Sequence, residues 1–499
     1  MPTAALLIFT AFLATCGFVC ASGPQLSVVD VKSYTKVQSH GNSTLYEIVA
    51  NATTSYAIAP YLVELVGTRY DMGYAYGTFF GDRIEKIYDA FLKSQLGKHW
   101  YDDALIDVIG IALDWQWNNY LSIQVPETFK EELDGIRDGA SAAGCPGCGS
   151  YVTRTIVLAN MPGDVQDVLY ILIREAFPSA LHLLPRKASQ EKVTHRQCSM
   201  FGIWGSRTEN QKLFSARNLD WNKDSGINKL KVITVYKPSD GAYAHATVGF
   251  VPLYGALAGM SASGITVHEA NLEEDQITFN GFPWVLRLRY IMEKASNLEE
   301  ARSLWENTNN TVGFNHMVGS GNDAVAYAMN KSKYCAVAME TMFNYTAFFP
   351  DNDPRQANAL YTNSETNSSD HIGFPVTEAV WRTNHGYDPI IREHYEWSQS
   401  PTSWSMQRYV MIHEAITSYE RNGISVGPME AINITAIVGD KGHHAYDCMD
   451  NTDGTNVLSV TYDPNDKIMY TAWESKAGEN WRPACCSSYL KVDMTPWFS

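Results

Sequence analysis

The sequence is poor in basic residues, and beyond its first residues it has no long apolar run. Lys and Arg total 38 against 54 Asp and Glu, which gives a formal net charge of −16 and a pI near 5.3. This acidic balance argues against nucleic acid or another polyanion as a partner. A membrane-spanning helix needs about 20 consecutive apolar residues, and no stretch after residue 20 supplies them. We therefore expect a soluble mature protein.

The beginning of the chain is typical of an exported protein, although it lacks the usual basic residues before its apolar core. Residues 4–20 form an apolar run that ends in small residues, which predicts a signal peptide over residues 1–22. Glycosylation sequons favour the same secretory route and predict surface positions. They lie at Asn42, Asn51, Asn309, Asn330, Asn344, Asn367 and Asn433. The expected location is therefore secreted or lysosomal, with N-linked glycans.

Cysteine usage fits an oxidising compartment. With the signal peptide removed and Cys198 set aside, the sequence leaves Cys145, Cys148, Cys335, Cys448, Cys485 and Cys486. An even set of this kind predicts disulfides, although sequence does not choose among the pairings. It also leaves Cys198 as the spare thiol. The alternative is a redox or zinc half-site at Cys145 and Cys148, with Cys485 and Cys486 completing a metal cluster together with His443 and His444. We favour disulfides, and expect neither a metal nor a cofactor.

A β-hairpin is predicted around Cys198. Residues 195–205 and 213–221 are apolar runs of strand length, and the polar residues 206–212 between them suit a loop. The first strand contains Cys198, and the second contains Arg217 and Asp220. Residues three apart face opposite sides of an ideal strand. Asp220 is therefore expected where the strand ends and bends.

A cut between Gln197 and Cys198 would place a thiol and a free α-amine on one residue. An α-amine has a pKa near ~8 and can accept the thiol proton. A guanidinium beside the sulfur would lower the thiol pKa from about 8.5, and a carboxylate could orient the amine. Arg217 and Asp220 are the candidates for these tasks. The alternative is a buried structural cysteine ahead of an ordinary surface Arg–Asp pair.

This arrangement of Cys198, a strand, a turn and the Ser-Ala-Arg-Asn-Leu-Asp-Trp segment at 215–221 resembles the N-terminal-nucleophile (Ntn) hydrolases. The nearest group is the isopenicillin N acyltransferase family, with acid ceramidase and choloylglycine hydrolase as further relatives. Other segments similar to the family occur, in the family's order, on both sides of Cys198 over most of the mature chain. They are residues 67–77, 131–140, 259–271, 381–385 and 403–409.

The resemblance implies an α+β fold, a four-layer αββα sandwich of two antiparallel sheets with helices outside. It also implies self-cleavage into segments 23–197 and 198–499, which would stay together as one intertwined catalytic domain in a two-chain heterodimer. Residues 178–195 are polar and basic, which suits an exposed loop that carries a cleavage point.

Further site residues follow from the same resemblance. Asn384, in Trp-Arg-Thr-Asn-His, and Asn271, at the end of the 259–271 segment, correspond to oxyanion-hole amides, which donate without titrating. Arg408 is the expected second guanidinium, with Arg392 as its rival. Glu269 is a second-choice polar residue beside Asn271.

The resemblance implies an amide hydrolase or acyltransferase acting on a small non-peptide amide. Residues 250–258 are apolar and suit either the wall of an acyl site or a core strand and turn. The first reading favours an N-acyl lipid substrate and transient contact with a membrane surface. Two alternatives remain: a papain-like protease served by His385, although the Gly-Trp context of that class is missing, and a secreted glycoprotein that keeps the fold without turnover.

The remaining pattern predicts a mixed α+β chain. A strand and turn leading into a long helix are expected over 57–96. Helices are also expected at 131–140 and from 403–409 onward, with a helix pair over 283–305. Strands are expected at 229–236, 244–251, 311–318, 324–329 and 334–340, with a closing hairpin at 455–464 and 467–473.

Overall fold

A computed structural model describes most of the chain. The described residues are 26–49, 59–96, 103–160, 173, 197–221, 226–272, 274, 276–357, 359–362, 369–371, 373–394, 403–437, 456–477 and 480–499. The predicted signal peptide, the 178–195 linker, Cys448, His443 and His444 lie outside them. Within these residues no helix has the length and apolar character needed to span a bilayer.

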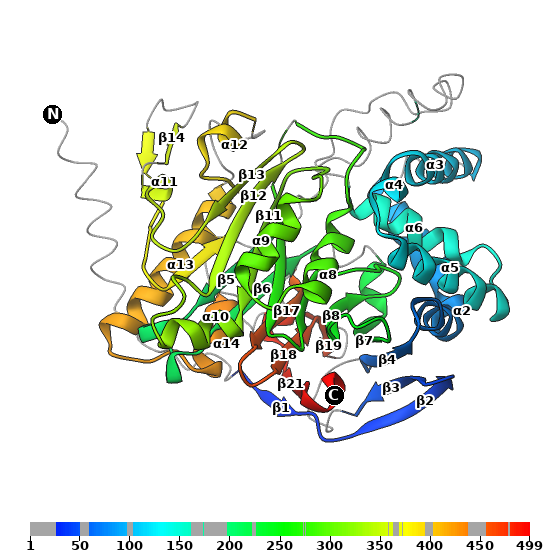
Figure 1. Ribbon diagram of the computed structural model, residues 1–499, viewed down its shortest axis with the longest axis horizontal. Helices are drawn as coiled ribbons and strands as arrows, with labels where there is room; N and C mark the ends of the chain where they lie inside the picture. Colours follow the sequence, from blue (N-terminus) through cyan, green and yellow to red (C-terminus); the bar gives the residue numbers. More distant parts are fainter. Residues whose placement is uncertain are drawn as a thin grey trace.

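Two β-sheets form the centre of the described structure (Figure 1). The smaller has seven strands in the order β1 (Val28–Asp30), β21 (Tyr489–Asp493), β18 (Ile468–Trp473), β17 (Asn456–Asp463), β6 (Phe214–Asp220), β5 (Gln197–Ile203) and β16 (Ala379–Arg382). The larger has ten, in the order β13 (Tyr345–Phe349), β12 (Ala336–Met342), β11 (Phe314–Ser320), β10 (Ile265–Asn271), β9 (Ala258–Ser261), β8 (His245–Phe250), β7 (Lys231–Pro238), β4 (Tyr61–Gly67), β3 (Ser43–Ile48) and β2 (Tyr34–His40).

The sheets pack face to face, with β10 against β5 and β6, and helices cover their outer faces. The larger sheet carries α2 (Arg69–Leu96), α8 (Trp284–Lys294) and α9 (Leu298–Glu306), with α5 (Glu127–Ala142) and α6 (Cys148–Ala159) beside α2. The smaller sheet carries α13 (Ser403–Arg421) and α14 (Pro428–Ile437). Other elements are α3 (Asp103–Gln116), a π-helix (Trp117–Leu121), α4 (Ser122–Gln124), α10 (Gly321–Ala328), α11 (Pro354–Ala357), α12 (Pro389–His394), α15 (Thr495–Phe498), β14 (Leu360–Thr362), β15 (Ser369–His371), β19 (Ser475–Ala477) and β20 (Asn480–Arg482). The predicted α+β sandwich is confirmed.

Both sheets are mainly antiparallel, as predicted, and each also contains one parallel pair. β1 pairs with β21 and β4 pairs with β7 in parallel. Strands joined by tight hairpins must run antiparallel, whereas strands brought together from distant parts of the chain are free of that constraint. Both parallel pairs join a strand that precedes residue 197 to one that follows it. The two segments predicted to result from cleavage are therefore interwoven in both sheets.

Most predicted elements are present, with one clear error at residues 324–329. The predicted strand there is part of helix α10. The side chain of Ser320 accepts a hydrogen bond from the Asp323 backbone N–H at 3.0 Å and caps this helix. A serine three residues before an acidic residue is a helix-start signal, and it outweighs the strand-like pattern that follows. The strands on both sides, β11 and β12, are at their predicted places.

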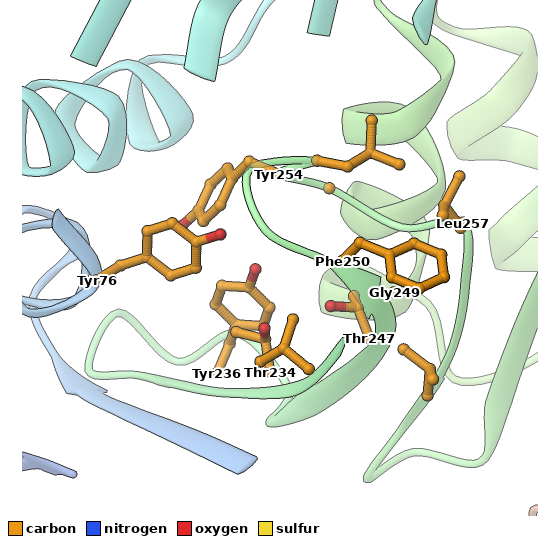
Figure 2. Close-up of a pocket in the computed structure, with 12 residues that line it drawn as sticks. Tyr76, Thr234, Tyr236, Thr247, Gly249, Phe250, Tyr254 and Leu257 are labelled. Atoms are coloured by element: carbon orange, nitrogen blue, oxygen red, sulfur yellow. The ribbon is translucent and has the colours of Figure 1, made fainter. Parts of the chain in front are cut away.

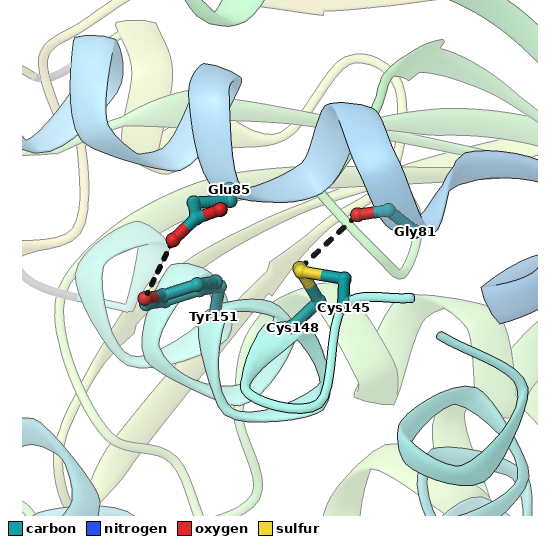
Figure 3. The surroundings of a disulfide bond; sticks show 5 residues. All are labelled: Gly81, Glu85, Cys145, Cys148 and Tyr151. Atoms are coloured by element: carbon teal, nitrogen blue, oxygen red, sulfur yellow. Dashed lines mark hydrogen bonds between the residues drawn. A yellow bond between two sulfur atoms is a disulfide. The ribbon is translucent and has the colours of Figure 1, made fainter. Parts of the chain in front are cut away.

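The cysteine prediction is partly confirmed. Cys145 and Cys148 form a disulfide, which removes them from any metal cluster (Figure 3). The Cys148 sulfur lies 3.1 Å from the Gly81 carbonyl oxygen, so this disulfide packs directly on α2. Cys486 is also disulfide-bonded. The prediction fails for Cys335, a buried free thiol just before β12. An even count therefore did not single out Cys198 as the spare thiol.

The sequon positions that the structure describes are mostly at the surface, as predicted. Asn42, Asn309, Asn330 and Asn344 are exposed, whereas Asn433 is half-buried on α14. Asn51 and Asn367 lie outside the described residues.

Glycines let α2 and α5 pack backbone to backbone. A Cβ on Gly73 would lie 1.8 Å from the Glu132 carbonyl oxygen, and one on Gly77 would lie 2.2 Å from that of Ile136. On the facing helix, a Cβ on Gly139 would lie 2.1 Å from the Tyr74 carbonyl oxygen. These distances are far below any real carbon contact, so the two helices must separate if either surface gains a side chain.

Gly77→Ala is therefore expected to destabilise the protein by about 1–3 kcal/mol, the usual cost of overpacking. Thermal and urea unfolding would measure it. Gly147→Ala is the matched control, because its Cβ would meet only the Tyr151 hydroxyl at 4.0 Å. Equal stability of the two variants would show that the helices separate without cost.

Candidate active site

Cys198 lies near the start of β5, in the interior of the smaller sheet. It is opposite Leu219 on β6, and Met200 is opposite Arg217. Directly opposite residues of an antiparallel pair share a face, so Cys198 and Arg217 point to the same side. That side faces the larger sheet, because Cys198 lines a cavity together with Glu269 and Asn271 of β10. The hairpin predicted from sequence thus brings the thiol and the guanidinium together.

Arg217 contacts the Cys198 thiol, the Glu269 carboxylate and the backbone carbonyl of Leu257. Its Nη2 lies 3.3 Å from the Cys198 sulfur and 2.6 Å from Glu269 Oε1. Its Nη1 donates to the Leu257 carbonyl oxygen at 2.7 Å. Burial alone would lower the pKa of Arg217, but the Glu269 and Cys198 charges reverse this effect and raise the pKa above its usual value. A charged guanidinium is therefore fixed beside the sulfur.

The thiol itself is held in its protonated form in the uncut chain. Burial, followed by the negative charge of Glu269, raises the pKa of Cys198 to about 12, and Arg217 opposes the shift. A thiol with this pKa is a poor nucleophile at neutral pH, since the thiolate is the reactive species. The site thus needs a base next to the sulfur, and an α-amine on Cys198 itself would supply one.

Asn384 and Arg408 hold the backbone of Cys198. The Cys198 N–H donates to Asn384 Oδ1 at 2.8 Å, and Arg408 Nη2 donates to the same oxygen at 2.7 Å. Arg408 Nη1 also donates to the Cys198 carbonyl oxygen. Asn384 Nδ2 donates to the Asn271 carbonyl oxygen at 2.7 Å. The structure thus places Arg408, and not its rival Arg392, against the predicted nucleophile.

Asp220 is the last residue of β6, at the strand end predicted for it. The register between β6 and β17 shifts opposite this point, between Asn456 and Leu458. Asn456 Nδ2 donates to Asp220 Oδ1 at 3.0 Å, and Asn456 Oδ1 accepts from the Cys485 N–H at 2.8 Å. Asp220 is opposite Gln197, and its charge contributes to the raised pKa of Cys198. Asn456 was not predicted, since in sequence it is only the first residue of a strand.

Glu269 is more central than its second-choice rank in the sequence suggested. It is 3% exposed, pairs with Arg217 and lines the cavity beside Cys198. Asn271 lines the same cavity, and its backbone carbonyl oxygen accepts a hydrogen bond from the Asn384 side chain. The structure therefore brings all six predicted site residues together in one largely buried cluster, with the second-choice Glu269 among them and with Asn456, which the sequence did not indicate.

The histidine required by the papain-like alternative faces other partners. His385 Nδ1 lies 2.7 Å from the Ser405 hydroxyl, and Nε2 lies 2.7 Å from the Tyr387 hydroxyl. Burial lowers its pKa to about 3, with nearby arginines acting in the same direction. Both ring nitrogens are thus engaged away from Cys198, which argues against this alternative. Among the described residues, no group of three or more His, Cys, Asp or Glu side chains is placed to hold a metal ion.

The cavity beside Cys198 is narrow, with about 10 Å³ of free space. That is close to the room that one water molecule requires. Its other walls are apolar, and come from the end of α6, the start of α8, β11 and the segment before β9. They are Ala159, Leu219, Trp221, Leu257, Trp284 and Phe314.

Two facing sheets lie with helices outside, and a cysteine near the start of a central strand contacts an arginine from its hairpin partner. This is the arrangement that the resemblance to the Ntn hydrolases implied. The family described as acyl-coenzyme A:6-aminopenicillanic acid acyl-transferase matches residues 206–478. That span is more than half of the 499 residues, and the chain belongs to this family. The match includes Arg217, Asp220, Asn271, Asn384 and Arg408, and begins after Cys198.

Similar curated proteins include an uncharacterised protein of Archaeoglobus fulgidus, 25% identical over 52% of this chain and 41% of its own length. Proteins dcd1B and dcd1A of Dictyostelium discoideum are 24% and 25% identical over 54% and 59% of this chain, and 50% and 61% of theirs. The chain thus spans about half the length of the curated relatives it matches.

Similar solved structures include a Caenorhabditis elegans N-acylethanolamine-hydrolyzing acid amidase ortholog, 12% identical with a TM-score of 0.35, covering 54% of this chain and 93% of the other. Penicillin V acylase from Agrobacterium tumefaciens is 14% identical with a TM-score of 0.35, covering 60% of this chain and 86% of the other.

Proposed function

We propose that this protein is a cysteine Ntn amidohydrolase or acyltransferase that cleaves a non-peptide amide after cutting its own chain before Cys198. The observation that carries the proposal is the environment of one residue. The Cys198 sulfur is 3.3 Å from Arg217, and its backbone nitrogen is 2.8 Å from Asn384. A buried polar site thus surrounds both atoms that an N-terminal nucleophile uses.

In the first step, the Cys198 sulfur attacks the Gln197 carbonyl carbon and its proton passes to the departing backbone nitrogen. Water then hydrolyses the resulting thioester, which leaves Gln197 as a carboxylate and Cys198 with a free α-amine. Arg408, which already binds the Cys198 carbonyl, holds the residue in place.

In the second step, the α-amine takes the thiol proton and the sulfur attacks the carbonyl carbon of the substrate amide. Asn384 and Asn271 are the proposed donors to the oxyanion. Collapse of the intermediate expels the amine with a proton from the Cys198 ammonium, and leaves an acyl thioester on the sulfur. Water resolves the thioester to a carboxylic acid, or a second amine resolves it to a new amide.

The apolar walls of the cavity favour an acyl group of apolar character, and we propose an N-acyl lipid as the substrate class. The proposed location is the secretory route or the lysosome, on the basis of the apolar start of the chain, the sequons and the Cys145–Cys148 disulfide. Processed segments 23–197 and 198–499 would remain one heterodimer, because strands from both build each sheet.

The test is intact mass and N-terminal sequencing of the deglycosylated protein from an oxidising expression host, with Cys198→Ala alongside. We expect two chains, one beginning at Cys198, and an uncut Cys198→Ala protein. Cys335→Ala is the matched control, since it removes another buried thiol outside the site and should be cut normally. A wild-type chain that stays whole at acidic and neutral pH would refute the mechanism.

A further inference from the structure

A second small cavity adjoins the one beside Cys198. It too has about 10 Å³ of free space, and it lies between α2, strands β7 and β8 and the segment before β9. Leu257 lines both cavities, and its carbonyl oxygen accepts the hydrogen bond from Arg217. The Leu257 side chain, 3% exposed, is thus a common wall between the nucleophile and this second space.

The second cavity differs from the first in its chemistry, because phenol groups converge on it. Figure 2 shows Tyr76, Tyr236 and Tyr254 turned toward one another around the hollow, with Thr234 and Thr247 on the strand side. The Tyr76 and Tyr254 ring centroids are 5.0 Å apart, and those of Tyr236 and Tyr254 are 5.9 Å apart. Apolar walls thus lead from Cys198 past Leu257 to hydroxyl groups.

The hydroxyl of Tyr254 is the unusual member of this group. Tyr254 is 1% exposed, and among the described residues its hydroxyl has no hydrogen-bond partner. A buried hydroxyl without a partner costs about 1–3 kcal/mol. Burial raises the pKa of Tyr76 and of Tyr236 well above the usual value, so these phenols stay neutral. The cavity therefore offers neutral hydrogen-bonding groups.

These groups do not suit an anion. Two guanidinium groups lie close to this cavity, and each is paired with a carboxylate. Arg217, which donates to the Leu257 carbonyl oxygen, is paired with Glu269. Arg289 lies 3.6 Å from the centre of the Tyr236 ring. It is already bound by both Glu132 carboxylate oxygens at 2.7 and 2.8 Å. No positive charge is therefore left for a carboxylate, whereas a hydroxyl or carbonyl oxygen would find donors and acceptors.

We propose that this tyrosine-lined cavity is a distal acyl subsite that selects acyl groups ending in a neutral oxygen function, such as an ω-hydroxyl, with Leu257 limiting the length that reaches it. The inference rests on the proposed function and specifies its substrate class. The acyl group, and not the amine, is assigned to the tyrosine-lined cavity, because the acyl group stays bound to the Cys198 sulfur after the amine leaves.

The test uses amides of a single fluorogenic amine whose acyl chains match in length and differ only in a terminal hydroxyl. Because one hydrogen bond to a buried partner is worth about a factor of ten, we expect kcat/KM to favour the hydroxylated chain about tenfold. In Tyr254→Phe this ratio falls toward one. Tyr88→Phe is the matched control, a buried tyrosine of the same helix as Tyr76 that lines neither cavity. Leu257→Ala is expected to shift the preferred chain length upward.

Binding of the product acids to Cys198→Ala, measured by calorimetry, separates the subsite from the activity. We expect the Kd of the hydroxylated acid to be about tenfold lower than that of the other acid, and this difference to disappear in Tyr254→Phe. That result supports the subsite even if no amide is cleaved and the proposed function fails. Equal binding of the two acids, or a preference that survives in Tyr254→Phe, overturns the subsite while leaving the proposed function intact.

Discussion

Arg217→Gln is expected to lower kcat/KM for amide cleavage by at least about 100-fold, on the scale that follows loss of a charged group in an enclosed site. The guanidinium lies 3.3 Å from the Cys198 sulfur, and together with Arg408 it opposes the raised pKa of the thiol. The same change leaves Glu269, 3% exposed, without its cation. Breaking a buried ion pair on one side costs about 3–5 kcal/mol of stability. Steady-state kinetics and urea unfolding would measure the two effects.

A double variant separates the two effects of this change. Arg217→Gln with Glu269→Gln removes the stranded carboxylate together with the guanidinium, so stability should largely return. Activity should not return, because the sulfur still lacks its cation. Arg137→Gln is the control, an arginine that pairs with Asp134; both side chains are more than half exposed, so its loss should cost no more than about 1 kcal/mol. Recovery of activity in the double variant would mean that Arg217 acts only through Glu269.

Local signals in the sequence were sufficient to predict the hairpin and its site residues. Polar residues between two apolar runs fixed the turn, and the pairing of β5 with β6 then placed Arg217 next to Cys198. Asp220 was expected at the end of its strand from strand periodicity, and it is the last residue of β6. These inferences needed only neighbours within one hairpin.

Contacts between distant parts of the chain could not be predicted in this way. Glu269 ranked second because sequence does not show that Arg217 reaches across to β10. Asn456 carries no signal of its contact with Asp220, and Leu257 contributes a carbonyl that any residue would have. The free Cys335 thiol was missed for the same reason, because a count of cysteines does not show which of them lie close enough to another cysteine to form a disulfide.

A buried charge network is expected to be the strongest polar contribution to holding the two predicted segments together. Arg69 Nη1 and Nη2 donate to Glu293 Oε1 and Oε2 at 2.7 and 2.9 Å. Arg289 binds Glu132 with two hydrogen bonds and approaches Glu293 at 3.2 Å. These side chains are at most 2% exposed. His245 accepts from Arg289, and burial lowers its pKa to about 3, so it adds no charge.

This network joins α2 and α5, which precede the predicted cut, to α8, which follows it. Glu132→Gln removes both carboxylate oxygens that bind Arg289 and leaves it only Glu293, which it shares with Arg69; Arg69 also keeps the partly exposed Asp240. Because a buried charge loses its main partner, the change is expected to cost about 3–5 kcal/mol. Urea unfolding would measure this cost, and size exclusion in high salt would show whether cut chains separate more readily. Glu127→Gln, on the same helix, is the control; its pair with Lys130 is solvent-exposed, so its loss should cost at most about 1 kcal/mol. If both variants are equally stable, the charge network is not needed, and the parallel strand pairs and the other packing between the segments hold them together.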